Sequence, residues 1–183
     1  MRDVPHTLAT GNQSTGGPSP ADFRHLMGMF TTGVCVVSVV GENNSIGAMT
    51  VNSFVSVSLD PMLVCWSLQN SSSQFDLYAK AKRFAVSILT RDHADLARRY
   101  ASRGDTQMRE EDFVQSAAGL PVIAGALAHL ECNLHSHHLA GDHTMIFGEV
   151  TGLSAPISFD SPDEAGAVSP LGFFNGQFCS IEP

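Results

Sequence analysis

The chain has 183 residues, of which 43% are hydrophobic and only 15% are charged, and its formal net charge is −8. This length fits one domain with a substantial core, and the low charge content leaves a somewhat apolar surface that favours self-association. Nucleic-acid affinity comes largely from Lys and Arg replacing counterions, so the acidic balance argues against nucleic acid as a partner.

The start of the chain has the pattern of a tail. Residues 10–20 are rich in Gly, Ser, Thr and Pro and lack apolar side chains, so we expect a flexible tail over 1–20 and a single domain over 21–183. The N-terminus has no apolar signal core, and no apolar run approaches the roughly 20 residues that cross a bilayer. We therefore expect a cytoplasmic protein that binds no membrane.

The first predicted element is a helix. Ser19 is placed as its N-cap and Pro20 as its first residue. Apolar side chains then recur at helical spacing on one face, and we expect this stripe to pack on the core: Phe23, Leu26, Met27 and Phe30.

Strands follow. Residues 33–40 form a β-branched run that ends in the turn signal "GENNS", and the strand-like segments 46–52, 53–59 and 62–68 come directly after it. Asp60 and Pro61 separate the last two. Several short strands without intervening helices indicate an antiparallel sheet or barrel.

The rest of the chain mixes both kinds of element. We expect a short helix within 74–81, a strand over 84–89, a helix capped by Asp92, an exposed loop over 102–112 and strands at 128–134, 143–153 and 171–174. Four cysteines stand far apart without a CxxC pair, and three lie in strand-like runs. We interpret these as reduced core residues: Cys35, Cys65, Cys132 and Cys179.

The run "AMTVNSFVSVSLDP", residues 48–61, alternates like a strand but has short hydroxyl and amide groups on its polar side. An exposed sheet face more often carries Lys, Glu or Arg. The pattern favours equally a half-exposed strand and a strand against which a ligand lies flat. A second polar cluster, "SLQNSSSQF" at residues 67–75, is either an ordinary helix cap or a cradle of N–H and hydroxyl donors for a phosphate.

Four histidines fall within nine residues: His135, His137, His138 and His143. A metal-binding module is one reading of this cluster, although no Cys or Glu stands at a familiar ligand spacing and we predict no metal. In "GDH" a Gly–Asp turn brings His143 to the start of a strand, where it either faces a cleft or is a surface turn residue. The chain lacks a GxSxG elbow and a suggestive carboxylate pair, so chemistry supplied by a cofactor, such as hydride transfer, fits best.

Six segments in order give the chain a family resemblance: "FTTGVCVVSV", "GAMTVNSFVSVSLDPMLV", "NSSSQFDLYAKAKRFAVSIL", "GLPVIAGALAHLEC", "GDHTMIFGEV" and "PLGFFNGQF". Together they resemble the flavin reductase family, the short-chain NAD(P)H:flavin oxidoreductases of two-component monooxygenases. The resemblance implies a mainly β fold with flanking helices: an FMN-binding split β-barrel with antiparallel Greek-key strands. It also implies a homodimer with flavin near the subunit interface.

The resemblance also implies roles for single residues. Met49, Thr50, Val51 and Asn52 would border the isoalloxazine ring, and Ser53, Ser67 and Leu68 would lie toward the ribityl chain and phosphate. Ser71, Ser72 and Ser73 would hold the phosphate, and Phe75 would close that end. His143 would lie by the nicotinamide, helped by Phe174.

The leading hypothesis is an NAD(P)H-dependent flavin reductase that passes a hydride from NADH or NADPH to FMN or FAD. The reduced flavin would then serve a separate oxygenase component. The alternative keeps the fold without the turnover: a flavin-binding electron carrier that has no NAD(P)H site.

Overall fold

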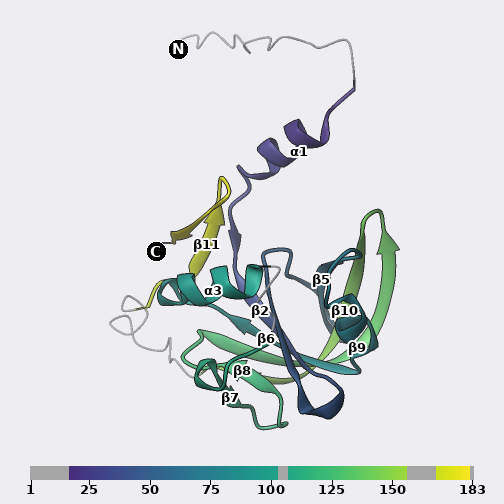
Figure 1. The fold of residues 1–183 in the computed structure, drawn as a ribbon, viewed down its shortest axis with the longest axis vertical. Helices are drawn as coiled ribbons and strands as arrows, with labels where there is room; N and C mark the ends of the chain where they lie inside the picture. Colours follow the sequence, from purple (N-terminus) through teal and green to yellow (C-terminus); the bar gives the residue numbers. More distant parts are fainter. Residues whose placement is uncertain (1–16, 103–106, 156–167, 182–183) are drawn as a thin grey trace.

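The computed structural model of the chain describes residues 17–102, 107–155 and 168–181. Most of the predicted tail, residues 1–16, lies outside this part, as do residues 156–167 of the last long connection. The described chain is built mainly from antiparallel strands (Figure 1).

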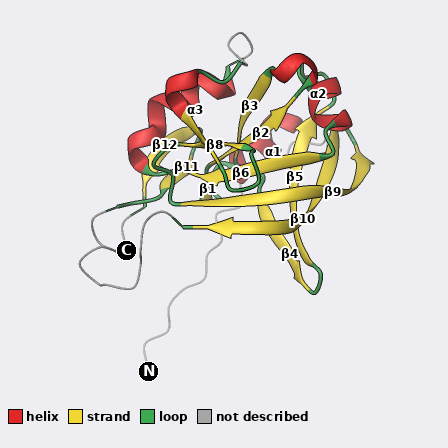
Figure 2. Ribbon diagram, turned by 90° about the horizontal axis from the view of Figure 1, so that it is seen from below, coloured by secondary structure: helices red, strands yellow, loops and turns green. Residues whose placement is uncertain are grey.

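Seven strands make the main sheet in the order β3-β2-β6-β9-β10-β5-β4 (Figure 2). Each neighbouring pair is antiparallel, as the run of short strands predicts. The strand bounds are β2 (Cys35–Val40), β3 (Ile46–Val51), β4 (Val55–Leu59), β5 (Met62–Gln69), β6 (Arg83–Ile88), β9 (Ala128–Ala140) and β10 (His143–Ser154).

The two end strands of this sheet, β3 and β4, follow each other in the chain and are joined by residues 52–54. They lie at opposite ends of the strand order, and no hydrogen-bonded ladder between them occurs among the described residues. The barrel is therefore open between these two strands, and the linker 52–54 crosses the opening.

Two small sheets complete the β structure. One has the order β1 (Thr32–Gly33), β11 (Leu171–Phe174), β12 (Gln177–Ser180), and the other pairs β7 (Phe113–Gln115) with β8 (Pro121–Ile123). Of these five strands the sequence predicts only β11, which has an apolar run. The others are too short, as in β1, β7 and β8, or too mixed in composition, as in β12, to show a strand pattern.

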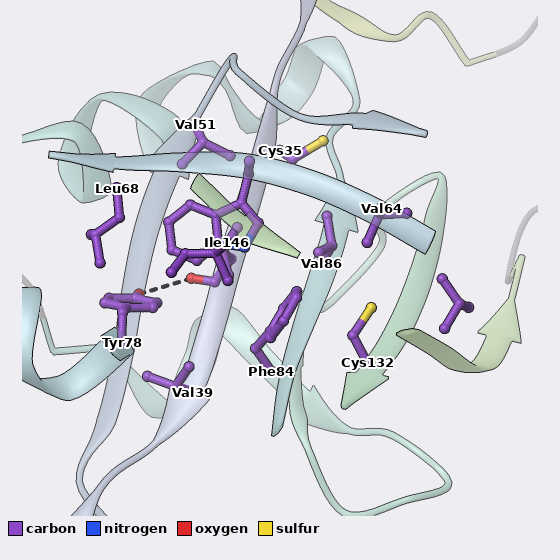
Figure 3. Close-up of a cluster of buried hydrophobic side chains, with 13 residues drawn as sticks. Cys35, Val39, Val51, Val64, Leu68, Tyr78, Phe84, Val86, Cys132 and Ile146 are labelled. Carbon is purple, nitrogen blue, oxygen red and sulfur yellow. Dashed lines mark hydrogen bonds between the residues drawn. The ribbon is translucent and has the colours of Figure 1, made fainter. Parts of the chain in front are cut away.

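Side chains from six strands of the main sheet fill its interior (Figure 3). Trp66 is 1% exposed and makes edge-to-face contacts with Tyr78 and Phe84, at centroid distances of 5.5 and 6.1 Å. A second core lies between the sheet and α3 (Ala94–Ala101), where Ala97 and Tyr100 are buried. Strand β2 lies between the two cores and contributes side chains to both, because successive side chains of a strand point to opposite faces of the sheet.

Helix α1 (Pro20–Met27) begins as predicted, with Ser19 as its cap in a reciprocal bond with Asp22. Its apolar stripe does not pack on the core, contrary to the prediction. The helix has no buried residue and stands away from the barrel (Figure 1). The exposed side chains are Phe23, Leu26, Met27 and Phe30, at 66, 61, 48 and 67%.

The helix predicted after β6 starts differently from its prediction. A 3-10 turn, η2 (Arg91–His93), precedes α3, and Thr90 rather than Asp92 is the capping residue. The backbone N–H of Thr90 donates to Nδ1 of His93 at 3.2 Å, so a histidine has the part usually taken by a Glu or Gln. The other helical segments are η1 (Glu42–Asn44), α2 (Phe75–Lys80) and η3 (Glu110–Asp112).

The segment predicted as an exposed loop, 102–112, is only partly exposed where the structure describes it. Met108 is 8% exposed and belongs to the second core. Asp112 forms an ion pair with Arg99 at 2.5 Å and accepts a hydrogen bond from the hydroxyl of Tyr100. This charged segment therefore contains one buried apolar residue, Met108, and one partly buried acceptor, Asp112.

Candidate functional site

A cavity of about 390 Å³ lies at the opening of the barrel. Its walls come from the end of β3, the linker 52–54, the end of β5, the turn that follows it, the C-terminal end of α3 and the first residue of β10. Ten of the thirteen predicted site residues line it: Met49, Thr50, Val51, Asn52, Ser53, Ser67, Ser71, Ser72, Ser73 and His143.

Two hydroxyls of the wall also hold the wall together. Thr50 donates its hydroxyl hydrogen to the main-chain oxygen of Ala97 at 2.9 Å, which ties β3 to α3. The hydroxyl oxygen of Ser53 accepts the backbone N–H of Ser67 at 3.0 Å, which ties the linker to β5. The Ser53 hydroxyl keeps its own hydrogen to donate, whereas Thr50 has used its hydrogen and keeps only lone pairs.

Residues 71–73, called here the serine turn, supply a group of free donors. The turn is held by the backbone N–H of Ser72, which donates to the oxygen of Gln69 at 3.0 Å, and by the hydroxyl of Ser72, which accepts from the N–H of Gln74 at 3.2 Å. Within the described chain, neither the N–H nor the hydroxyl of Ser71 or Ser73 has a protein partner. Four donors are therefore available to a ligand in the cavity.

The cavity is uncharged apart from what His143 can carry. None of its described lining residues is a Lys, Arg, Asp or Glu, and its polar groups are hydroxyls, amides and backbone N–H groups. Groups of neutral donors of this kind bind a phosphate without a cationic side chain. The set therefore suits a ligand with a polar, anionic end and a flat body that fits close to the backbone.

His143 is the first residue of β10 and follows a turn in which Gly141 has a φ of +65°, a conformation that favours glycine. Its Nδ1 lies 2.8 Å from Oδ1 of Asp142, and its side chain is 39% exposed. This hydrogen bond lowers the pKa of Asp142 below its ordinary value of 3.8. With Nδ1–H donating to the carboxylate, the neutral ring keeps Nε2 as an acceptor.

Three of the predicted residues lie elsewhere. Leu68 is fully buried in the barrel core, and Phe75 packs against the same core. Phe174 belongs to β11 of the small sheet and is 46% exposed. The structure thus brings the polar part of the predicted set to one cavity and places these three apolar side chains outside its lining.

Five further residues line the cavity that the sequence did not indicate: Gln69, Gln74, Tyr100, Ala101 and Ser102. The two glutamines flank the serine turn, so their proximity to it was a usable signal. Gln74 is 8% exposed, and its Nε2 donates to the oxygen of Ala48 at 3.3 Å. The residues at the end of α3 had no such signal, because they lie far in the sequence from the residues of the other walls.

Burial raises the pKa of Tyr100, one of these residues, so its hydroxyl stays protonated.

The remaining histidines do not join His143. His135, His137 and His138 lie on the outer half of β9 and are exposed, and the ring of His138 contacts Phe147 edge to face. Across the described residues, no group of three or more His, Cys, Asp or Glu side chains is arranged to hold a metal ion. The described helices are also all too short and too polar to cross a membrane.

Comparison with known proteins agrees with this fold. The sequence matches the family described as flavin reductase like domain over residues 27–182. The chain therefore belongs to the flavin reductase-like family, and the predicted resemblance and the split-barrel fold class are confirmed.

Several relatives have names that state an activity. FMN reductase (NADH) SmoA of Agrobacterium fabrum is 45% identical over 135 residues, which cover 74% of this chain and 76% of SmoA. HsaB of Rhodococcus jostii, the reductase subunit of a flavin-dependent monooxygenase, is 32% identical over 164 residues, covering 90% and 79% of the two chains.

Solved structures are similar over nearly the whole chain. Flavin reductase PheA2 superposes with a TM-score of 0.77 at 32% identity and covers 91% of this chain and 100% of its own. The NADH:FAD oxidoreductase SgcE6 of Streptomyces globisporus, solved with NAD and FAD fragments, gives a TM-score of 0.77 at 35% identity. That superposition covers 89% of this chain and 93% of SgcE6.

Proposed function

We propose that this chain is an NAD(P)H:flavin oxidoreductase that binds FMN or FAD in the cavity at the opening of the barrel. The observation that carries the proposal is the convergence of β3, the linker 52–54 and the serine turn on one uncharged, donor-rich cavity. Family membership and the relatives named as NADH-dependent FMN reductases support the same activity.

The residues of the cavity fit a flavin in one orientation. We assign residues 49–52 as the wall for the isoalloxazine ring, where the short side chains of Thr50, Val51 and Asn52 let a flat ring approach the backbone. Ser53 and Ser67 lie between this wall and the serine turn, which suits the hydroxylated ribityl chain. The four unpaired donors of Ser71 and Ser73 receive the phosphate.

A bound flavin supplies the hydride acceptor, and NADH or NADPH supplies the hydride. The protein's task is then to hold two flat rings in contact and to exclude competing geometries, which lowers the entropic cost of the reaction. His143 is placed to orient the nicotinamide end of the donor. Asp142 fixes its tautomer, so that Nε2 is available as an acceptor.

The reduced flavin is proposed to leave for a separate oxygenase. Relatives named as reductase subunits or components of flavin-dependent monooxygenases support this role. The cavity lies at the opening of the barrel, and no Lys, Arg, Asp or Glu is among its described lining residues. A flavin would be held there by neutral hydrogen bonds, so the reduced flavin can dissociate and an oxidised flavin can replace it.

We further propose that the protein is a homodimer. The exposed apolar residues of α1 lie beside an apolar groove of about 700 Å³, whose described lining has Arg24 as its single charged residue. Two chains of charge −8 repel each other, so a nearly uncharged apolar surface such as this one suits an interface between them. The groove reaches Asn52 and Ser53, which also line the cavity, so a second copy placed here would adjoin the flavin.

The decisive experiment is a kinetic assay of the purified protein with the four pairings of NADH or NADPH with FMN or FAD, followed at the absorbance band of the reduced nicotinamide. We expect flavin-dependent oxidation of the nicotinamide, with NADH preferred as in the relatives named for it. A yellow protein that oxidises neither nicotinamide would contradict the proposal and favour the electron-carrier alternative.

His143→Ala tests the position assigned to the histidine, with His137→Ala as the matched control on the same hairpin. His137 is exposed on β9 and does not line the cavity. We expect His143→Ala to raise the KM for NADH by about tenfold, the scale of one lost hydrogen bond, and to leave the Kd for flavin within about twofold. Equal losses in both quantities would count against the assigned role.

A further inference from the structure

Asn70 connects two turns of the site although it does not line the cavity. It lies directly before the serine turn, and all its hydrogen bonds go to residues around His143. Its backbone N–H donates to the oxygen of Asp142 at 3.0 Å, and its Nδ2 lies 3.4 Å from the oxygen of Gly141. Its Oδ1 accepts the hydroxyl hydrogen of Thr144 at 2.8 Å. One side chain therefore contacts the chain on both sides of His143.

The contact lies where the sheet ends. The last pair of the β10–β5 ladder joins His143 to Gln69, and beyond it each strand enters a turn. Asn70 continues the connection past this last pair by its bonds to Asp142 and Gly141, and its third bond reaches back to Thr144 inside the ladder. Thr144 is 5% exposed and Asn70 is half-buried, so the bond between them is partly shielded from water, which strengthens it relative to the same bond on the surface.

We propose that Asn70 is a positioning residue that couples the serine turn to His143, so that a phosphate held by the turn fixes the place of the imidazole. The inference rests on the proposed function, which assigns the phosphate to the serine turn and the nicotinamide to His143. A rotation of Asn70 moves Ser71 through the peptide bond and moves the backbone at 141–144 through the hydrogen bonds. The flavin phosphate is thereby linked to the place of hydride donation.

A purely structural role for Asn70 makes a different prediction. If the bonds only stabilise the hairpin, their loss lowers the melting temperature and leaves the properties of the folded site unchanged. If the bonds couple the two turns, their loss leaves a folded protein in which the phosphate no longer influences the position of His143. Because FMN and riboflavin differ only in the phosphate, the two flavins should then affect the imidazole equally.

Asn70→Ala removes both side-chain bonds of Asn70 and is the full test of the link. Thr144→Val removes one of them from outside the cavity, because Thr144 does not line it. Thr144→Val keeps the shape of the side chain and removes the hydroxyl, whereas Thr144→Ser keeps the hydroxyl.

The test compares FMN with riboflavin in each folded variant by two readouts. The first is the ring resonances of His143, followed by NMR as each flavin is added. In the wild type and Thr144→Ser we expect FMN to shift these resonances further than riboflavin. In Thr144→Val we expect a smaller difference between the two flavins, and in Asn70→Ala equal shifts. The second is the KM for NADH with FMN, which we expect Thr144→Val to raise by about threefold to tenfold while kcat stays within about twofold.

Different outcomes separate this inference from the proposed function. A folded Asn70→Ala protein in which FMN still shifts the His143 resonances further than riboflavin, or a folded Thr144→Val protein that keeps the full wild-type difference, overturns the coupling, whatever the activity. If the wild-type resonances already respond equally to both flavins, the coupling is likewise overturned. The assignment of an oxidoreductase stands or falls separately, on the oxidation of NADH by the wild type.

Discussion

The hydroxyl of Tyr78 in α2 donates a hydrogen bond to the main-chain oxygen of Val37 in β2, 2.9 Å away, across the interior of the barrel (Figure 3). Both residues are at most 2% exposed. Since α2 follows the serine turn after Gln74, this bond anchors the proposed phosphate end of the site to β2, the second strand of the main sheet. Burial raises the pKa of Tyr78 well above 10, which keeps the hydroxyl protonated as the donor.

Tyr78→Phe removes this bond and keeps the ring. We expect the free energy of unfolding to fall by about 1–2 kcal/mol, because the bond is lost inside a core and an oxygen is left less well paired. Tyr78→Leu also removes the edge contact with Trp66 and should cost more, about 3 kcal/mol. Chemical denaturation measures both values. Equal stability of Tyr78→Phe and the wild type would show that the anchor does not depend on this bond.

The serine turn provides a test of where the phosphate binds. Ser71→Ala and Ser73→Ala each remove one unpaired hydroxyl, and we expect each to weaken FMN binding by about threefold to tenfold while the Kd for riboflavin changes less. Ser56→Ala is the matched control, since Ser56 is exposed on β4 and does not line the cavity. Fluorescence titration gives the constants.

Two results would contradict this placement of the phosphate. The first is an equal loss of affinity for FMN and riboflavin in Ser71→Ala and Ser73→Ala, which would place the lost contact away from the phosphate. The second is a loss in Ser56→Ala as large as theirs, which would indicate a general effect of removing a hydroxyl.

Local signals in the sequence predicted the parts of the site that lie close together along the chain. The run 48–61 and the cluster 67–75 are separated only by β5, and both carry short polar side chains in strand or turn patterns. Composition alone left open which hydroxyls serve a ligand. The structure separates them: Thr50 and Ser53 line the cavity, whereas Ser56 and Ser58 on β4 do not.

Other features depend on contacts that no local pattern contains. Tyr100 and Ser102 reach the cavity because the hydrogen bond between Thr50 and Ala97 holds α3 beside β3. The apolar periodicity of a helix indicates which face is buried, but not which strand that face packs against. The stripe of α1 is a similar case. Its apolar periodicity predicts the helix correctly, but an apolar helix face can pack either against the core of its own chain or against another molecule, and the periodicity does not distinguish the two.

The exposed face of α1 gives a prediction about assembly. Leu26→Glu and Phe30→Glu place charges on side chains that are 61 and 67% exposed, so a monomer should tolerate both. If a second copy covers this face, each variant should convert a dimer to a monomer in light scattering coupled to size exclusion. Leu139→Glu is the control, because Leu139 is 77% exposed at the far end of β9. A wild-type monomer, or a dimer that survives both substitutions, would contradict the proposed interface.

The buried thiols predict how stability depends on alkaline pH. Burial raises the pKa of Cys35 and of Cys132 from 9.0 to about 12 in each case. Well below pH 9 these thiols are protonated in both the folded and the unfolded chain and cause no pH dependence. Above pH 9 the unfolded chain loses these protons first and binds fewer of them, so the free energy of unfolding falls as the pH rises toward 12.

The slope should reach about 1.4 kcal/mol per pH unit for each thiol within this window. Urea unfolding at several pH values measures it, and Cys132→Ala, although less stable at pH 7, should show a shallower decline than the wild type. Thiol labelling provides a second measurement: all four cysteines are free, and only Cys179 is not buried, so one thiol should react quickly in the folded protein. A Cys132→Ala protein with an unchanged slope would mean that this thiol ionises alike in both states.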